Sequence, residues 1–131
     1  MNVNFTVFID KILSGEKRQT IRRASPKWEN VKVGDKLTLY TGLKECRKLG
    51  EAVVESITPI CLLTVPRRAW IKTPLGVLSI CDDDLELIAI MDGFNNLCQF
   101  WQFFAEKYGD EESEFNVIRW TDFKEAKDER L

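Results

Sequence analysis

The chain has 131 residues, of which 44% are hydrophobic and 31% charged, with a formal net charge of −2; this length suits one domain, and this composition excludes an intrinsically disordered chain. The absence of histidine excludes Ser/His/Asp triads, Cys/His dyads and imidazole metal ligands, while four scattered cysteines without a CxxC pair favour reduced thiols over a metal site. No apolar run approaches the ~20 residues that span a bilayer, and the N-terminus lacks the features of a signal peptide, so we expect a cytoplasmic protein.

The predicted elements, taken in chain order, indicate an α+β fold. Apolar residues at helical spacing predict a first helix over 4–14, which Gly15 ends. Short strands are predicted over 19–22, 36–40, 50–60, 69–72 and 76–80. A second amphipathic helix is predicted over 95–108, with Asn95 or Asn96 as its N-cap, followed by a strand over 115–120.

These elements predict a small β-barrel of about five to six strands with two to three flanking helices, because several short strands are joined by turns. Residues 1–123 are expected to form this single domain, and the charged residues 124–131 to form a frayed tail. Leu97, Phe100, Trp101 and Phe104 recur at helical spacing, and the aromatic residues Phe100, Trp101, Phe103 and Phe104 are expected in the core, with a stacking platform for a ligand as the alternative.

The charges are divided unevenly along the chain. Residues 1–72 carry 14 Lys and Arg against 7 Asp and Glu, a balance of +7, whereas residues 73–131 carry 5 against 14, a balance of −9, and the two sum to −2. A basic half with interspersed aromatic residues suits a phosphate-bearing ligand. The alternatives are that its charges pair with the acidic half after folding, or that the acidic half engages a basic partner.

The segment SGEKRQTIRR at 14–23 holds the main candidate site. Lys17 is predicted on a turn, while Thr20 and Arg22, two positions apart, project from the same face of a strand. A lysine with a lowered pKa can take the proton of a threonine hydroxyl and make it a nucleophile, and a guanidinium can hold an anion or a base edge. The alternative is that Thr20 fills an ordinary strand position and the cations are solvated.

The string Gly15-x-Lys17-x-x-Thr20-x-Arg22, followed by the turn Val33-Gly34-Asp35, resembles the ASCH family, whose fold is a compact β-barrel similar to the PUA domain. The second half agrees, since IAIMDGFNNLCQFWQFFAEKYG resembles the family's acidic-Gly-Phe turn before a helix, and FNVIRW its closing strand. The resemblance covers residues 4–123. The stretch LYTGLKECRKLGE resembles relatives from phages and prophages.

The resemblance implies a function connected with RNA, bound in a cationic cleft between barrel and helix. Some small members of the family are amidohydrolases that remove the acetyl group from N4-acetylcytidine, and another member is described as a ribonuclease. The lysine, threonine and glutamate of the amidohydrolase pattern fall on Lys17, Thr20 and Asp92 here. Aspartate is one methylene shorter than glutamate, which places the carboxyl about 1 Å short of the family's position.

Further candidate ligand contacts are spread along the basic half. Arg22 is expected to bind a phosphate or a base edge, and Trp28 to stack on a base or pack over a barrel end. Lys44 and Arg47 on the loop 42–49 are candidate phosphate contacts, as is Arg67, which precedes Arg68 and Trp70; solvated faces are the alternative.

The prediction is therefore a protein that binds RNA or a modified nucleoside in a cationic cleft. The alternatives are a metal-independent amidohydrolase with Lys17, Thr20 and Asp92 as its catalytic residues, or a ribonuclease. We expect no cofactor, no metal site and no membrane partner, and a monomeric state.

Overall fold

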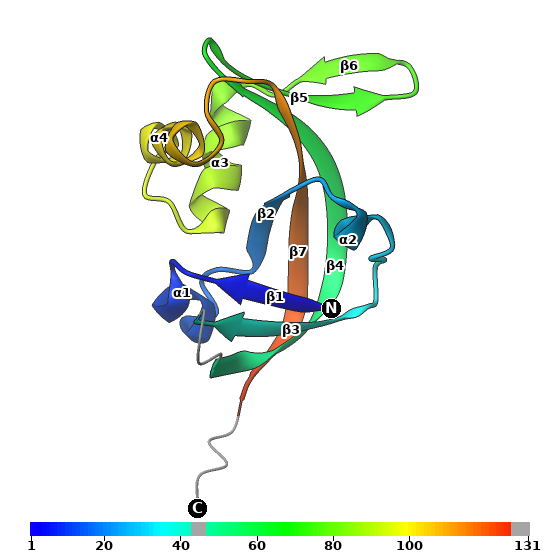
Figure 1. The fold of residues 1–131 in the computed structure, drawn as a ribbon, viewed down its shortest axis with the longest axis vertical. Helices are drawn as coiled ribbons and strands as arrows, with labels where there is room; N and C mark the ends of the chain where they lie inside the picture. The colour runs from blue at the N-terminus through cyan, green and yellow to red at the C-terminus, as the bar shows by residue number, and fades with distance from the viewer. Residues whose placement is uncertain (43–46, 127–131) are drawn as a thin grey trace, which may run out of the picture.

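The computed structural model describes residues 1–42 and 47–126, in which one mixed sheet of seven strands is accompanied by four helices (Figure 1). The strands are β1 (Asn2–Phe5), β2 (Gln19–Arg23), β3 (Lys36–Thr41), β4 (Arg47–Thr64), β5 (Arg67–Thr73), β6 (Gly76–Ser79) and β7 (Ser113–Glu125). The helices are α1 (Ile9–Ser14), α2 (Pro26–Glu29), α3 (Asp82–Asp92) and α4 (Leu97–Tyr108). No helix in the described part of the chain is long and apolar enough to cross a membrane.

The long strand β4 organises the sheet. One edge of β4 pairs antiparallel with β7, and its other edge pairs with β3 near its start and with β5 near its end. Strand β1 adds parallel to β3, β6 adds antiparallel to β5, and β2 pairs with β7. Register shifts interrupt the β3–β4 and β4–β7 ladders, and such bulges increase the local twist and let a sheet curl.

The curled sheet does not close into a complete barrel. In the described residues no ladder joins the edge strands β1 and β2. A side chain crosses the seam instead, since Arg22 Nη2 donates a hydrogen bond to the main-chain oxygen of Asn4 at 2.7 Å. The α+β class is confirmed, but the described strands and helices outnumber the prediction, partly because the predicted first helix included residues 4 and 5 of β1 and the short α2 has no periodic signal.

Two hydrophobic cores lie on opposite faces of the β4–β7 ribbon. One lies between the ribbon and the helices α3 and α4, and the other lies inside the curled sheet (Figure 1). Because successive side chains of a strand point to opposite faces, Val117 belongs to the first core and its neighbour Ile118 to the second. Phe100, Trp101 and Phe104 are buried in the first core as predicted, whereas Phe103 is only partly buried against it and lines a cavity.

The chain ends differ from the prediction. Residues 4 and 5 belong to β1 rather than to the first helix, and Phe5 packs edge-on against Trp120 with ring centroids 5.9 Å apart. Gly15, at φ 84°, ends α1 as expected. At the other end, Lys124 and Glu125 pair with β4, although the sequence placed them in the tail, and residues 127–131 lie outside the described residues.

Candidate functional site

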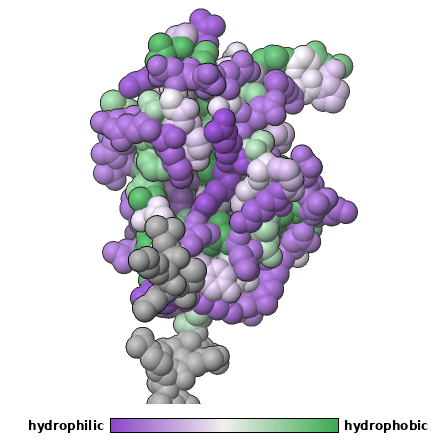
Figure 2. All heavy atoms as spheres, viewed as in Figure 1, coloured by the Kyte–Doolittle hydropathy of each residue, from purple (hydrophilic) through white to green (hydrophobic). Residues whose placement is uncertain are grey.

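A small cavity of about 60 Å³ lies between the curled sheet and the α3–α4 pair. It brings together Lys17 from the turn after α1, Thr20 and Arg22 from β2, and Asp92, the last residue of α3. Six aromatic residues complete much of its wall: Phe5, Phe8, Phe94, Phe103, Phe104 and Tyr108. Figure 2, viewed as Figure 1, shows hydrophilic side chains over β2 in the middle of the face turned to the viewer.

Lys17 and Asp92 form a buried ion pair at the base of this cavity. Lys17 Nζ lies 3.4 Å from Asp92 Oδ2 and donates a hydrogen bond to the main-chain oxygen of Asp92 at 2.5 Å. The two side chains are only 3% and 9% exposed. Burial lowers the pKa of Lys17 and raises the pKa of Asp92, because the loss of hydration outweighs their mutual attraction. Both groups are thereby suited to exchanging a proton.

Thr20 and Arg22 form the second polar pair of the cavity. Arg22 Nε donates to Thr20 Oγ1 at 2.9 Å, so the two side chains share one face of β2 as predicted. Burial lowers the pKa of Arg22, which nevertheless stays protonated as guanidinium groups do in proteins. Since Thr20 Oγ1 accepts from Arg22, its own proton is available for a ligand. In the described residues no hydrogen bond joins Lys17 to Thr20.

Gln19 is a polar residue of the site that the sequence reasoning missed. It is fully buried; its Nε2 donates to Asp92 Oδ1 at 3.4 Å and to the main-chain oxygen of Ile88 at 3.0 Å. Its Oε1 accepts from Arg119 Nε at 3.2 Å. Gln19 thus holds the Asp92 carboxylate and links α3 to β7. Strand alternation sends Gln19 to the face opposite Thr20, so no sequence signal pointed to it.

Asn4 adds an unsatisfied acceptor to the cavity wall. Its Nδ2 donates to the main-chain oxygen of Gly42 at 2.7 Å, whereas its buried Oδ1 has no hydrogen-bond partner among the described residues. A buried acceptor without a partner is costly, and a ligand N–H group in the cavity would satisfy it. The sequence placed Asn4 at the start of a helix, which hid this role.

Three other predicted ligand contacts, Trp28, Arg47 and Arg67, do not line this cavity. Trp28 is 6% exposed and belongs to the core inside the curled sheet. Arg47 is an exposed residue at the start of β4, and Arg67 lines a different cavity near the start of α3. Lys44 lies outside the described residues, as does Cys46 on the same loop.

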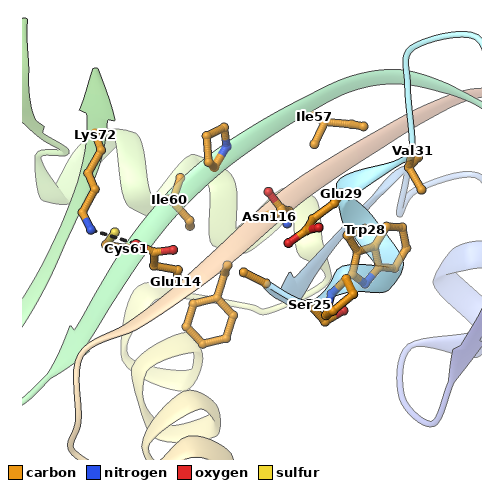
Figure 3. Close-up of a pocket in the computed structure, with 14 residues that line it drawn as sticks. Ser25, Trp28, Glu29, Val31, Ile57, Ile60, Cys61, Lys72, Glu114 and Asn116 are labelled. Carbon is orange, nitrogen blue, oxygen red and sulfur yellow. Dashed lines mark hydrogen bonds and ion pairs between the residues drawn. The ribbon is translucent and has the colours of Figure 1, made fainter. Parts of the chain in front are cut away.

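A larger hollow of about 630 Å³ lies next to α2, along the β4–β7 pair (Figure 3). At one end Lys72 and Glu114 form an exposed ion pair at 2.7 Å, and Glu29, Asn116 and the edge of Trp28 lie toward the other end (Figure 3). Its lysine is already paired with a carboxylate, so this hollow lacks the excess of cations found beside Thr20. No cluster of potential metal ligands occurs in the residues that the structure describes.

The fold around the site has a counterpart among solved structures. The crystal structure of ASCH from Zymomonas mobilis is similar at a TM-score of 0.56 and 14% sequence identity, over 95% of this chain and 68% of that chain. Neither a family model nor a curated protein matches the chain. An identity this low establishes the fold alone. The chain therefore has the α+β fold of an ASCH domain, with the Lys17 cavity between its curled sheet and its helix pair.

Proposed function

We propose that the chain binds RNA or a nucleoside-type ligand in the Lys17 cavity. The observation that carries the proposal is the charge balance of the site, where the described lining residues include the cations Lys17, Arg22 and Lys107 against one carboxylate, Asp92. Charges removed from water require opposite charges or hydrogen-bond partners. An anionic ligand would supply the missing negative charge.

The remaining lining suits a nucleobase. Phe5, Phe8 and Phe103 offer ring faces or edges for stacking, and stacking against aromatic side chains is a common way to hold unpaired bases. The Thr20 hydroxyl can donate a hydrogen bond to a base edge, and Asn4 Oδ1 can accept one from an exocyclic amine. The ASCH-like fold supports the same class of ligand.

A nucleoside requires the cavity to open, because its present volume of about 60 Å³ lies below the ~300–1,000 Å³ of typical ligand pockets. Residues 6–8 form one rim of the cavity. Phe8 has a φ of 61°, a conformation that is rare for a bulky side chain. We expect this segment to move when the ligand enters.

The test of binding is fluorescence anisotropy of a labelled single-stranded RNA at graded salt concentrations. We expect the affinity to fall steeply as salt rises, and Arg22→Gln to weaken binding about tenfold through the loss of a charged hydrogen-bond donor. Lys32→Gln, which removes an exposed cation remote from the cavity, is the matched control. Equal affinities for Arg22→Gln and the wild-type protein would contradict the proposal.

A second candidate function is hydrolysis of an amide on a nucleobase. The directions of the two pKa shifts favour it, since a lowered pKa suits Lys17 as a base and a raised pKa suits Asp92 as an acid. Thr20 Oγ1 or a water molecule would attack the amide carbonyl carbon and pass its proton to Lys17. Asp92 would protonate the amine as the carbon–nitrogen bond breaks. Where Thr20 attacks, a water molecule would then cleave the resulting Thr20 ester, giving one proton to Asp92 and releasing the carboxylic acid, while Lys17 returns its proton to the Thr20 hydroxyl.

Incubation with N4-acetylcytidine, followed by chromatography for released cytidine, tests this second function. We expect Thr20→Val, which keeps the side-chain shape but removes the hydroxyl, to lose turnover if Thr20 is the nucleophile. Asp92→Glu should increase turnover if the shorter carboxylate limits proton transfer. Absence of cytidine at high enzyme concentration would exclude this substrate, and gel analysis of the RNA from the binding assay would reveal a ribonuclease.

A further inference from the structure

A second cavity, of about 590 Å³, lies between the β5–β6 hairpin and the start of α3. It is lined by Asp82, the first residue of α3, whereas Asp92, the last, lines the Lys17 cavity. At a rise of about 1.5 Å per residue the two ends of this helix are about 15 Å apart. The cavity near the hairpin is therefore separate from the site of the proposed function.

Two adjacent arginines give this cavity an excess of positive charge. Arg67 and Arg68 both line it and are exposed, and neither forms an ion pair within the described residues. Lys72 on the same strand differs, since it pairs with Glu114 at 2.7 Å. The one carboxylate among the lining residues is Asp82, so an anionic group would be attracted to the arginine end.

The rest of the lining is largely apolar and includes two tryptophans. Trp70 is half-buried, and Trp101 contributes a side chain that is only 3% exposed. Leu63, Val77 and Ile80 add aliphatic surface. The volume falls within the range of small-molecule pockets. An apolar cavity with unpaired guanidinium groups fits a planar ring that carries an anionic group.

We propose that this cavity binds a nucleotide, with its base against Trp70 and its phosphate on Arg68, which shares a face of β5 with Trp70, while Arg67 adds positive charge to the cavity from the other face of the strand. Guanidinium groups bind phosphate through two parallel hydrogen bonds, and indole rings stack on bases without regard to sequence. The same chemistry is offered by a free mononucleotide and by one nucleotide of an RNA strand. The proposal concerns residues outside the Lys17 cavity, so its test does not depend on the function proposed for that cavity.

In the experiment, the 131-residue chain is titrated with cytidine monophosphate. Tryptophan fluorescence and calorimetry measure the binding. Trp28, Trp101 and Trp120 are 6%, 3% and 1% exposed, so quenching by a stacked base reports mainly on Trp70. We expect the double variant Arg67→Gln/Arg68→Gln to weaken binding at least about tenfold. The double variant Arg18→Gln/Lys32→Gln removes the same net charge from exposed positions elsewhere, and it should change binding less than about twofold.

Further measurements distinguish a free mononucleotide from a nucleotide within an RNA strand. They also distinguish binding in this cavity from binding in the Lys17 cavity. Cytidine, which lacks the phosphate, should bind wild type and the Arg67/Arg68 variant equally weakly. If a short single-stranded RNA loses affinity in this variant while the mononucleotide does not bind, the ligand is a nucleotide within an RNA strand. The proposal is overturned if both double variants weaken binding equally, or if Lys17→Gln abolishes binding and the Arg67/Arg68 variant does not. Normal binding of mononucleotide and RNA by the Arg67/Arg68 variant also overturns it.

Discussion

Lys17 and Asp92 show how burial acts on single ionisable residues. Each is shifted toward its neutral form, Lys17 to a lower pKa and Asp92 to a higher one, although they lie 3.4 Å apart. A buried ion pair contributes little net stability because desolvation offsets the attraction. The pair is therefore more readily explained by a role in the cavity than by a role in stabilising the fold.

Replacing Lys17 alone should destabilise the protein strongly. Lys17→Met leaves the Asp92 carboxylate buried beside Gln19 without its cationic partner, and such a break costs about 3–5 kcal/mol of unfolding free energy. The double variant Lys17→Met/Asp92→Leu should recover most of this loss, since it removes both charges. Urea unfolding measures both effects. A double variant no more stable than Lys17→Met would show that the pair itself stabilises the fold.

The raised pKa of Asp92 predicts a specific pH dependence. Between the ordinary value of 3.8 and its raised value, the folded protein binds more protons at this site than the unfolded chain. The stability that Asp92 contributes is therefore present below about pH 3.8 and is lost as pH rises through the folded-state pKa.

Subtracting the unfolding free energies of Asp92→Asn from those of the wild-type protein across this pH range isolates the effect from that of other carboxylates. We expect the difference to decline with increasing pH. Lys17 and Arg22 both face Asp92 and oppose the shift, so a difference that rises with pH would show that their attraction outweighs burial.

At the scale of elements, local patterns identified α4 well and the N-terminal strand poorly. The helix α4 runs from Leu97 to Tyr108, and Asn96 is its N-cap, with Oδ1 accepting from Gln99 N at 2.9 Å. The N-cap hydrogen bond that marks the start of α4 joins residues within one helical turn, so the local sequence is enough to predict it. The strand β1 instead depends on parallel pairing with β3, more than thirty residues away. Helical spacing of apolar residues near the N-terminus could not reveal that pairing.

The two neighbouring asparagines before α4 provide a matched test of the cap. Asn96→Ala removes the acceptor for Gln99 N and should cost about 1 kcal/mol of unfolding free energy. Asn95→Ala should cost less, because Asn95 contributes its main-chain N–H, which donates to Gln99 Oε1 at 3.2 Å and is retained in the variant. Chemical denaturation of both variants checks the ranking, and equal losses would contradict the cap assignment.

At the scale of the whole molecule, the β4–β7 ribbon joins two cores that lie on its opposite faces. The ribbon pairs from Gly50–Glu125 to Leu62–Ser113 and contributes side chains to both cores. Disruption of either core therefore disturbs a strand pair that the other requires. This arrangement predicts that the sheet and the α3–α4 pair unfold together.

Matched leucine truncations test this cooperativity. Leu37 is buried inside the curled sheet and Leu85 on the buried face of α3, with exposures of 0% and 1%. Each Leu→Ala change should cost about 2–5 kcal/mol through lost burial and the remaining cavity. Far-ultraviolet circular dichroism and tryptophan fluorescence should report the same single transition in both variants. Separate transitions for the two probes would show that the cores unfold independently.

The sequence by itself determined the features that depend on short-range patterns. Alternation placed Thr20 and Arg22 on one face, helical spacing and an asparagine cap defined α4, and the motif resemblance indicated the fold and the grouping of Lys17 with Asp92. These inferences succeed because a strand or helix repeats its geometry every few residues.

Only the tertiary structure decided which other residues reach the site. Asn4 and Gln19 line or support the Lys17 cavity, while Trp28 and Arg67 lie elsewhere. Lys17 contacts Asp92, which lies 75 residues away in the sequence. Arg119 donates a hydrogen bond to Gln19, which lies 100 residues away. Such contacts are set by how the sheet curls and where α3 ends against it. No local periodicity encodes that geometry, because it arises from packing between elements that are distant in sequence.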